Sequence, residues 1–355
     1  MTQPSRMRLT ILRGTEFWND SCALPELRDA VDHGATGATS NPVIVYSAAK
    51  ADPKKWTPVL DAIIQAHETA TEDEIAWLLI EEMGRQAAAI LAPVHSQTKG
   101  RQGFLSMQVS PKFHAHAARM VEHGRALAAL APNIAIKVPA TAAGAQAAEE
   151  LVAAGINVNA TVSFTVSQAV TLAEAFERGL DRAQTSGADL TRLHPYMTLM
   201  VGRLDDLLQR VMVKERITID PGYLGWAGIA VFKRAHAIFK ARGFRSTLLS
   251  AAYRHHLHWS QLIGPGVIHT IPYAWWKQFE ASDLEVEETL DRPVRPEIVE
   301  ALLRHFKDFG LAYEEGAMAP ASFASFGASV HTLNQFLGGF QDLLGLVRER
   351  MLAPR

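Results

Sequence analysis

The sequence predicts an α/β protein with a single (β/α)8 barrel of the TIM type and additional helices, including a long C-terminal helix. Short runs of β-forming residues recur along the chain, and each is followed by a longer amphipathic or alanine-rich stretch. There are eight such runs, the number of parallel strands that closes a barrel of this type.

The eight candidate strands lie in the first three quarters of the chain. They are residues 16–19, 35–39, 104–109, 134–138, 158–162, 198–201, 246–250 and 267–270. The segment 143–154 is typical of the helices expected between them, because Ala147, Ala148 and Leu151 share one face and Gly155 offers a C-cap. Strands separated by helices in this way pair in parallel.

Additional helices are expected at both ends of the barrel sequence. Residues 55–100 contain more helix than one crossover needs, and the acidic stretch 280–291 is interpreted as a solvated loop followed by two helices. The last helix carries an apolar stripe that must pack on the barrel or on a second subunit, which would make a homodimer. The stripe consists of Leu333, Phe336, Leu337, Phe340, Leu344, Val347 and Met351. We expect one domain over 1–355, with a helical extension from about residue 290 to residue 355.

Composition excludes several functional classes. The chain is 48% hydrophobic and 20% charged, which is typical of a globular protein. Its net charge of −2 gives no general field that would gather nucleic acid or an anionic membrane. The single cysteine, Cys22, cannot form an intramolecular disulfide or a zinc cluster. No stretch reaches the roughly 18 apolar residues of a spanning helix, so we expect a cytoplasmic protein.

Polar residues stand where several candidate strands end, which is where barrel enzymes place their chemistry. Lys137 is either a desolvated, nucleophilic amine or a lysine that reaches the surface or pairs with a carboxylate. Asp20 is either a functional carboxylate or a helix N-cap. Asn41 either forms a turn or binds a polyol. Asn159 and Thr161 alternate along one strand, so both face the interior.

Several segments resemble the transaldolase family and occur in the family's order. They are 18–20, 37–42, 136–141, 155–161, 164–168, 201–203 and 262–265. The most specific are Ile-Lys-Val-Pro-Ala-Thr at 136–141 and Gly-Ile-Asn-Val-Asn-Ala-Thr at 155–161. The resemblance covers nearly the whole chain and implies covalent transfer of a dihydroxyacetone unit between sugar phosphates, without a metal or organic cofactor.

The resemblance also implies roles for individual residues. Lys137 would form a Schiff base with the ketose, and Asp20 would move a proton at the C4 hydroxyl. Thr161 would position a catalytic water. Asn41 and Asn159, together with Thr39, would bind the dihydroxyacetone unit.

The phosphate end of the substrate is assigned to two arginines by the same resemblance. Arg203 matches an arginine that binds phosphate, a role for which the planar guanidinium is suited. The alternative for Arg203 is a surface ion pair with Asp205 or Asp206. Arg254 is assigned as the second phosphate arginine on a looser match.

Some positions depart from the family pattern. Gln108 stands where transaldolases have a glutamate, and an amide can orient a water but cannot act as an acid or base. Fructose 6-phosphate aldolases of the same superfamily carry glutamine there, but they have a tyrosine where this chain has Met200. Thr198 replaces a serine that often helps to bind phosphate, and Ala252 replaces another hydroxyl residue.

Three functions therefore remain open. The principal hypothesis is a transaldolase that uses sedoheptulose 7-phosphate or fructose 6-phosphate as the donor. The first alternative is a class I aldolase that releases dihydroxyacetone. The second is a non-catalytic sugar-phosphate-binding protein, which an unused buried Lys137 and Asp20 disfavour.

Two groups of histidines are not expected to bind metal. His255, His256 and His258 are predicted to lie on a mostly exposed helix face, with no carboxylate at a matching interval. His114 and His116 are expected within a helix beyond the third strand. Of the neighbours Trp275 and Trp276, one is expected to be buried and the other partly exposed.

Overall fold

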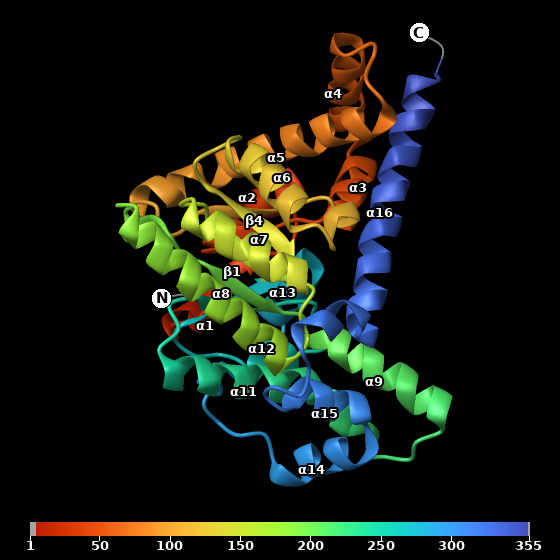
Figure 1. The fold of residues 1–355 in the computed structure, drawn as a ribbon. Coiled ribbons are helices and arrows are strands. Elements are labelled where there is room, and N and C mark those ends of the chain that lie inside the picture. The colour runs from red at the N-terminus through yellow and green to blue at the C-terminus, as the bar shows by residue number, and fades with distance from the viewer. Residues whose placement is uncertain (1–4, 354–355) are drawn as a thin grey trace.

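Eight parallel strands form a closed barrel in the computed structural model, which describes residues 5–353 (Figure 1). The strands are β1 (Glu16–Asn19), β2 (Gly37–Thr39), β3 (Phe104–Gln108), β4 (Ile134–Pro139), β5 (Val158–Thr161), β6 (Tyr196–Leu199), β7 (Thr247–Ser250) and β8 (Val267–Ile271). Each strand pairs with the next along the chain, and β8 pairs with β1 to close the ring. The predicted fold class is confirmed.

All eight strands overlap their expected positions, and β6 shows the clearest displacement. It begins at Tyr196 and ends at Leu199, whereas the sequence indicated a strand over 198–201. Val201 belongs instead to the following helix. The apolar run continues from the strand into that helix, so hydrophobicity alone does not mark the boundary.

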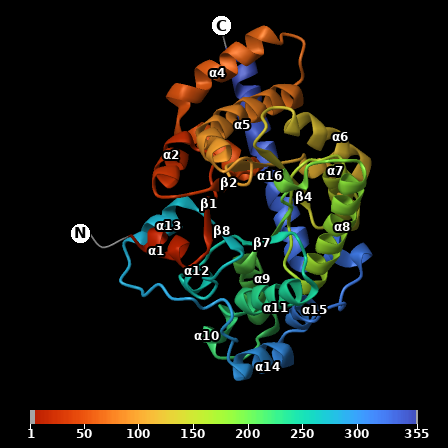
Figure 2. The same ribbon diagram turned by 90° about the vertical axis from the view of Figure 1, so that its left-hand side faces the viewer.

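Helices surround the barrel, as Figure 2 shows around the labelled strands β1, β2, β4, β7 and β8. The α-helices up to the end of the barrel are α1 (Arg6–Leu12), α2 (Leu24–Asp32), α3 (Pro42–Ala51), α4 (Pro53–Ala66), α5 (Glu72–Gln97), α6 (Ala117–Ala128), α7 (Ala142–Ala153), α8 (Val166–Thr185), α9 (Val201–Glu215), α10 (Pro221–Leu224), α11 (Ala227–Arg242), α12 (Leu257–Ser260) and α13 (Tyr273–Glu280). Short 3-10 helices are η1 (Pro111–Phe113) and η2 (Leu190–Arg192). The extra helices expected within 55–100 are thus α4 and α5. Among residues 5–353, no helix has the length and apolar character needed to cross a membrane.

The region after the barrel contains more helix than expected. Residues 281–295 form a mostly exposed loop, which confirms the interpretation of the acidic stretch. Three α-helices follow instead of two, with one 3-10 helix between the second and the third, because short helices give a weak periodic signal. They are α14 (Pro296–His305), α15 (Lys307–Tyr313), η3 (Pro320–Ser325) and α16 (Gly327–Met351).

The apolar stripe of α16 packs on its own chain. Phe336, Phe340, Leu344 and Val347 are buried, and α16 lies mainly against α3 and α5 (Figure 1). The Phe340 ring contacts Trp77 of α5 with ring centroids 5.6 Å apart. Of the two partners expected for the stripe, the barrel side is the one found.

The interior of the barrel is layered because alternate residues on each strand point inward. An apolar layer toward the N-terminal ends of the strands contains Trp18, Phe104, Ala135, Tyr196, Leu249 and Ile268. A buried polar layer follows, with Thr39, Ser106, Lys137, Asn159, Thr198 and Thr270. The polar layer lies nearer the C-terminal ends of the strands, as do Asp20, Gln108 and Thr161.

Candidate active site

Lys137 lies inside the barrel near the C-terminal end of β4. Its side chain is 5% exposed, and Nζ donates a hydrogen bond to the Ser40 carbonyl at 3.1 Å. Burial lowers the pKa of Lys137 to about 8, with the charge of Asp20 opposing this shift and the charge of Arg203 adding to it. The alternative in which this lysine reaches the surface is excluded. A substantial fraction of the amine is therefore neutral near pH 8.

Asp20 follows β1 and faces the same end of the barrel. Its Oδ1 accepts a hydrogen bond of 2.6 Å from the Thr39 hydroxyl, which lies 2.7 Å from the hydroxyl of Thr270. Burial raises the pKa of Asp20, while the charge of Lys137 and the Thr39 hydrogen bond act in the opposite direction. Asp20 does not cap a helix, because α2 begins at Leu24 with Ala23 in the N-cap position.

Asn159 occupies a fully buried position on β5, next to Lys137 in the strand register. Its Nδ2 donates to the Ser106 hydroxyl at 3.1 Å, and its Oδ1 accepts from the Thr198 hydroxyl at 2.6 Å. These two contacts fix the orientation of the amide. Thr198 is 2% exposed and contacts Asn159, so its hydroxyl lies in the polar layer.

Gln108 and Thr161 lie on β3 and β5, the two strands that neighbour the strand of Lys137. Gln108 pairs directly with Lys137 in the β3–β4 register, and its buried Oε1 has no hydrogen-bond partner. A buried acceptor without a partner is uncommon in proteins and indicates a position for a ligand or a water. The Thr161 hydroxyl lies 3.9 Å from the Met200 sulfur, which is a weak contact that leaves the hydroxyl free to bind elsewhere.

Asn41 forms the turn that the sequence indicated. It is the N-cap of α3, and its Oδ1 accepts a hydrogen bond of 3.1 Å from the backbone N–H of Ile44. Because the cap uses the oxygen, the Nδ2 group remains to donate to a ligand. The turn and the binding role are thus compatible.

The two predicted phosphate arginines come together at the edge of the barrel mouth. Arg203 lies in the first turn of α9, donates to the Gln335 side chain and lies over the Phe336 ring at 5.9 Å. Burial lowers the pKa of Arg203 to about 10, and the charge of Arg254 adds to the shift. Arg254 pairs with Asp206, with Nη2 and Oδ2 2.7 Å apart. Within residues 5–353 the ion pair expected as the alternative for Arg203 is made by Arg254 instead.

The Nε of Arg203 is buried and has no hydrogen-bond partner. A guanidinium can bind an oxyanion through Nε together with a terminal nitrogen, so the unpartnered Nε is suited to such a ligand.

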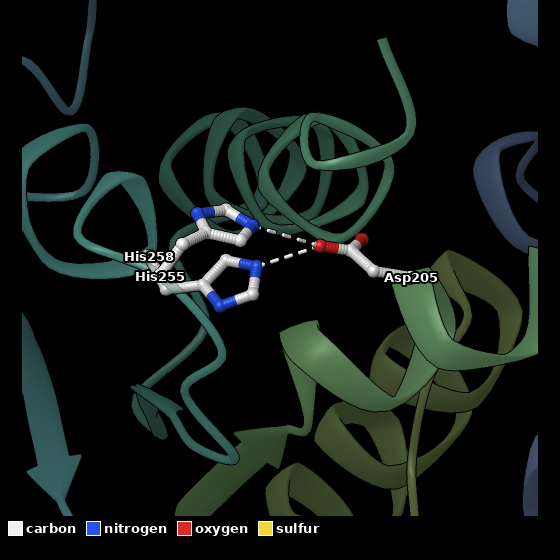
Figure 3. A group of neighbouring side chains, drawn as sticks. All are labelled: Asp205, His255 and His258. Atoms are coloured by element: carbon white, nitrogen blue, oxygen red, sulfur yellow. Dashed lines mark hydrogen bonds and ion pairs between the residues drawn. The ribbon is translucent and has the colours of Figure 1, made fainter. Parts of the chain in front are cut away.

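The expectation of an exposed histidine face is wrong for His258. This side chain is fully buried, and its Nε2 lies 2.8 Å from Asp205 Oδ2, as Figure 3 shows. His255 Nε2 lies 3.3 Å from the same oxygen, whereas His256 is exposed as expected. The carboxylate comes from α9, fifty residues earlier, and no local interval can reveal such a partner.

The other predictions for ring side chains have mixed outcomes. His114 and His116 do not lie within a helix, because His114 ends η1 and His116 precedes α6. The sequence pattern does not show that α6 begins only at Ala117. Trp276 is fully buried and Trp275 is partly exposed, as expected.

Sequence reasoning missed some polar neighbours of the site. Ser106 and Thr270 contact Asn159 and Thr39, and Gln335 contacts Arg203. Ser106 could have been found, because it shares the inward parity of Gln108 on β3. Gln335 could not, since its contact depends on how α16 crosses the first turn of α9.

Comparison with known proteins shows the family to which the chain belongs. A family model described as Transaldolase/Fructose-6-phosphate aldolase matches residues 17–334. The chain belongs to this family. Transaldolases similar to it include that of Thiobacillus denitrificans, 29% identical over 287 residues (73% of this chain and 79% of the relative). Transaldolase 1 of Streptomyces avermitilis is also 29% identical over 287 residues (73% and 75%), and the transaldolase of Neisseria meningitidis serogroup A is 29% identical over 286 residues (75% and 81%).

Membership of the transaldolase/fructose-6-phosphate aldolase family confirms the resemblance found in the sequence, and the match extends into α16. The family implies sugar phosphate substrates. At this identity the relatives support a transaldolase-family enzyme without specifying the reaction.

Proposed function

We propose that this protein is a Schiff-base transaldolase. It transfers a dihydroxyacetone unit from a ketose phosphate, sedoheptulose 7-phosphate or fructose 6-phosphate, to an aldose phosphate acceptor. The observation that carries the proposal is Lys137, a buried amine with a pKa of about 8 at the functional end of a barrel strand. An unprotonated amine is the form that attacks a carbonyl carbon.

In the first half of the reaction, Lys137 Nζ adds to the C2 carbonyl, and loss of water gives an iminium. Asp20 removes the proton of the C4 hydroxyl, and the bond between C3 and C4 breaks. Its electron pair moves into the iminium to form an enamine, and the shortened aldose leaves. The raised pKa of Asp20 makes it a stronger base, and the nearby charge of Lys137 helps to keep it ionised.

In the second half, the enamine carbon attacks the acceptor aldehyde and Asp20 returns its proton to the new hydroxyl. Water then hydrolyses the imine and releases Lys137. Thr161 and Gln108, on the strands that neighbour that of Lys137, would orient this water. Gln108 Oε1, which has no partner, can accept one of its hydrogens.

The same arrangement suggests how the substrate is held. Asn159 and Asn41, with Thr39 beside Asp20, would bind the hydroxyls of the dihydroxyacetone unit. Arg203 and Arg254 would bind the phosphate. Thr198 would act through Asn159, because its hydroxyl donates to Asn159 Oδ1.

A second candidate function is a class I aldolase that releases dihydroxyacetone. Gln108 favours it, because the fructose 6-phosphate aldolases that the sequence resembles carry glutamine at this position. The two functions share the Lys137 imine and differ in whether an acceptor aldose is needed to free the enzyme.

The test is the intact mass of the protein after borohydride reduction with fructose 6-phosphate, with and without erythrose 4-phosphate. We expect a dihydroxyacetone-sized adduct that disappears in Lys137→Ala and is depleted by the acceptor. Lys233→Met is the matched control, because burial also lowers the pKa of Lys233 to about 8, but its amine donates to the Thr289 and Arg292 carbonyls. An adduct that persists in Lys137→Ala would rule out the mechanism. An adduct insensitive to the acceptor would favour the aldolase.

A further inference from the structure

Asp205 connects three segments of the chain beside the anion-binding end of the site. It lies on α9, two residues after Arg203, and is 8% exposed. Its Oδ1 accepts a hydrogen bond of 2.9 Å from the backbone N–H of Gly228, at the start of α11. Its Oδ2 lies 2.8 Å from His258 Nε2 and 3.3 Å from His255 Nε2 (Figure 3).

The other ring nitrogen of His258 determines its tautomer. The backbone N–H of Arg254 donates to His258 Nδ1 at 3.0 Å, so Nδ1 carries the lone pair. The neutral ring must then carry its proton on Nε2, which donates it to Asp205. His258 thus connects the Asp205 carboxylate to the backbone of Arg254.

This tautomer argues against a metal ion at Asp205, His255 and His258, although their ligand atoms lie within 4.8 Å of one another. A histidine that binds a metal through Nε2 donates its Nδ1–H to an acceptor. Here Nδ1 faces a donor, the Arg254 N–H, and Nε2 has no free lone pair.

The segment that His258 holds approaches α9 closely and is strained. A Cβ at Gly202 would lie 2.1 Å from the Ala252 carbonyl oxygen and 2.7 Å from Arg254 Cγ. Ala252 adopts a backbone φ of +65°, a value that residues other than glycine rarely adopt. Such a backbone persists only where its surroundings fix it, and the His258 contact lies two residues further along.

We propose that Asp205 and His258 are positioning residues that hold the Arg254 backbone against the helix that carries Arg203, so that both guanidinium groups meet one anion. The inference rests on the proposed role of these arginines in phosphate binding. Asp206, the next residue on α9, holds the Arg254 side chain. Two consecutive carboxylates therefore position one arginine. Asp205 acts on the Arg254 backbone through His258, and Asp206 pairs with the Arg254 side chain.

Two substitutions of His258 separate its two hydrogen bonds. Asparagine places an acceptor at the level of Nδ1, so His258→Asn keeps a partner for the Arg254 N–H. Glutamine reaches the level of Nε2, so His258→Gln keeps the contact with Asp205 and leaves the Arg254 N–H without a partner. His256→Gln is the matched control, because His256 is exposed on the same segment.

The first readout is the Kd of inorganic phosphate, measured from its effect on the thermal unfolding temperature, which requires no catalysis. We expect His258→Gln to raise this Kd about tenfold, because a buried donor loses its partner. We expect His258→Asn and the control to stay within about threefold of the unsubstituted protein.

The second readout separates positioning from general damage. With fructose 6-phosphate, His258→Gln should raise KM and leave kcat largely unchanged. With unphosphorylated fructose, kcat/KM should not change, because that substrate has no phosphate for Arg254 to bind.

Several outcomes would overturn the proposal. One is that the unsubstituted protein does not bind phosphate, and another is that all variants have the same phosphate Kd. The others are an equal loss of kcat/KM with fructose 6-phosphate and with fructose, and stoichiometric metal binding that depends on His258. If His258→Gln does not fold, Asp205→Asn replaces it, because no orientation of the amide can accept from both Gly228 and His258. Failure of both variants to fold would assign the pair to packing alone. Phosphate binding that depends on His258, without a Lys137 adduct, would refute the proposed function and leave this inference standing.

Discussion

Lys137 and Asp20 share one solvent-poor space, and burial moves their pKa values toward each other. It lowers the pKa of the amine to about 8 and raises that of the carboxyl. Each charge also stabilises the other, so the two ionisations are coupled. The sequence placed both residues at strand ends and offered a desolvated amine as one alternative for Lys137, but the choice between the alternatives required the structure.

Formation of the imine, measured as the sum of the ketose-sized and dihydroxyacetone-sized adducts that borohydride traps, should depend on the Lys137 pKa. The sum is needed because Asp20→Asn removes the group proposed to start cleavage between C3 and C4. Because only the neutral amine attacks, the rate should rise with pH through about 8 and then level off. Asp20→Asn removes a charge that stabilises the ammonium form, so the midpoint should move to lower pH. Borohydride trapping for fixed times, from about pH 6 to about pH 10, measures the pH dependence of the rate in the unsubstituted protein and in Asp20→Asn. An unchanged midpoint in Asp20→Asn would contradict the coupling.

Gln108→Glu should restore a proton relay beside Lys137. The adduct should form about a hundredfold faster near neutral pH, the low end of general acid–base effects. Rapid-quench trapping measures this rate, and Gln108→Ala serves as the control that removes the amide without adding a carboxyl. A rate in Gln108→Glu no higher than in the unsubstituted protein would show that water alone carries these protons.

At the scale of the strands, inward parity explains why much of the site could be predicted. Alternate residues of β5 face the interior, so Asn159 and Thr161 could be placed together from the sequence. The partners of Asn159 come from β3 and β6, and they could not be predicted because local sequence periodicity does not show which residues of different strands lie opposite one another. His258 failed as a prediction for a related reason, since its partner lies on another helix.

Substitution of Gly37 tests how tightly the apolar layer of the barrel is packed. An added Cβ there would lie 2.4 Å from the Trp18 ring, which fills the barrel interior. Gly37→Ala should lower the free energy of unfolding by about 1–3 kcal/mol through overpacking. Gly338→Ala on α16 is the control, because nothing lies within 4 Å of its added Cβ. This control should be neutral or stabilising by about 0.5–1 kcal/mol. Denaturant unfolding measures the change in the free energy of unfolding for both variants.

For the whole molecule, we propose that residues 1–355 fold as one domain. The α16 stripe is buried on α3 and α5, so the C-terminal helices and the barrel share a core. Thermal unfolding followed by far-ultraviolet circular dichroism and by tryptophan fluorescence should give coincident transitions. Two separated transitions would indicate that the C-terminal helices form an independent unit.

The contact between α16 and Arg203 has a consequence for the order in which the protein is made. All eight strands have been synthesised by Ile271, whereas Gln335 and Phe336 follow more than sixty residues later. A growing chain therefore carries Lys137 and Arg203 long before the α16 residues that contact Arg203. The proposed phosphate site can thus be completed only late in biosynthesis, and a product cut short before α16 would lack both the Gln335 partner of Arg203 and the helix that shares a core with the barrel.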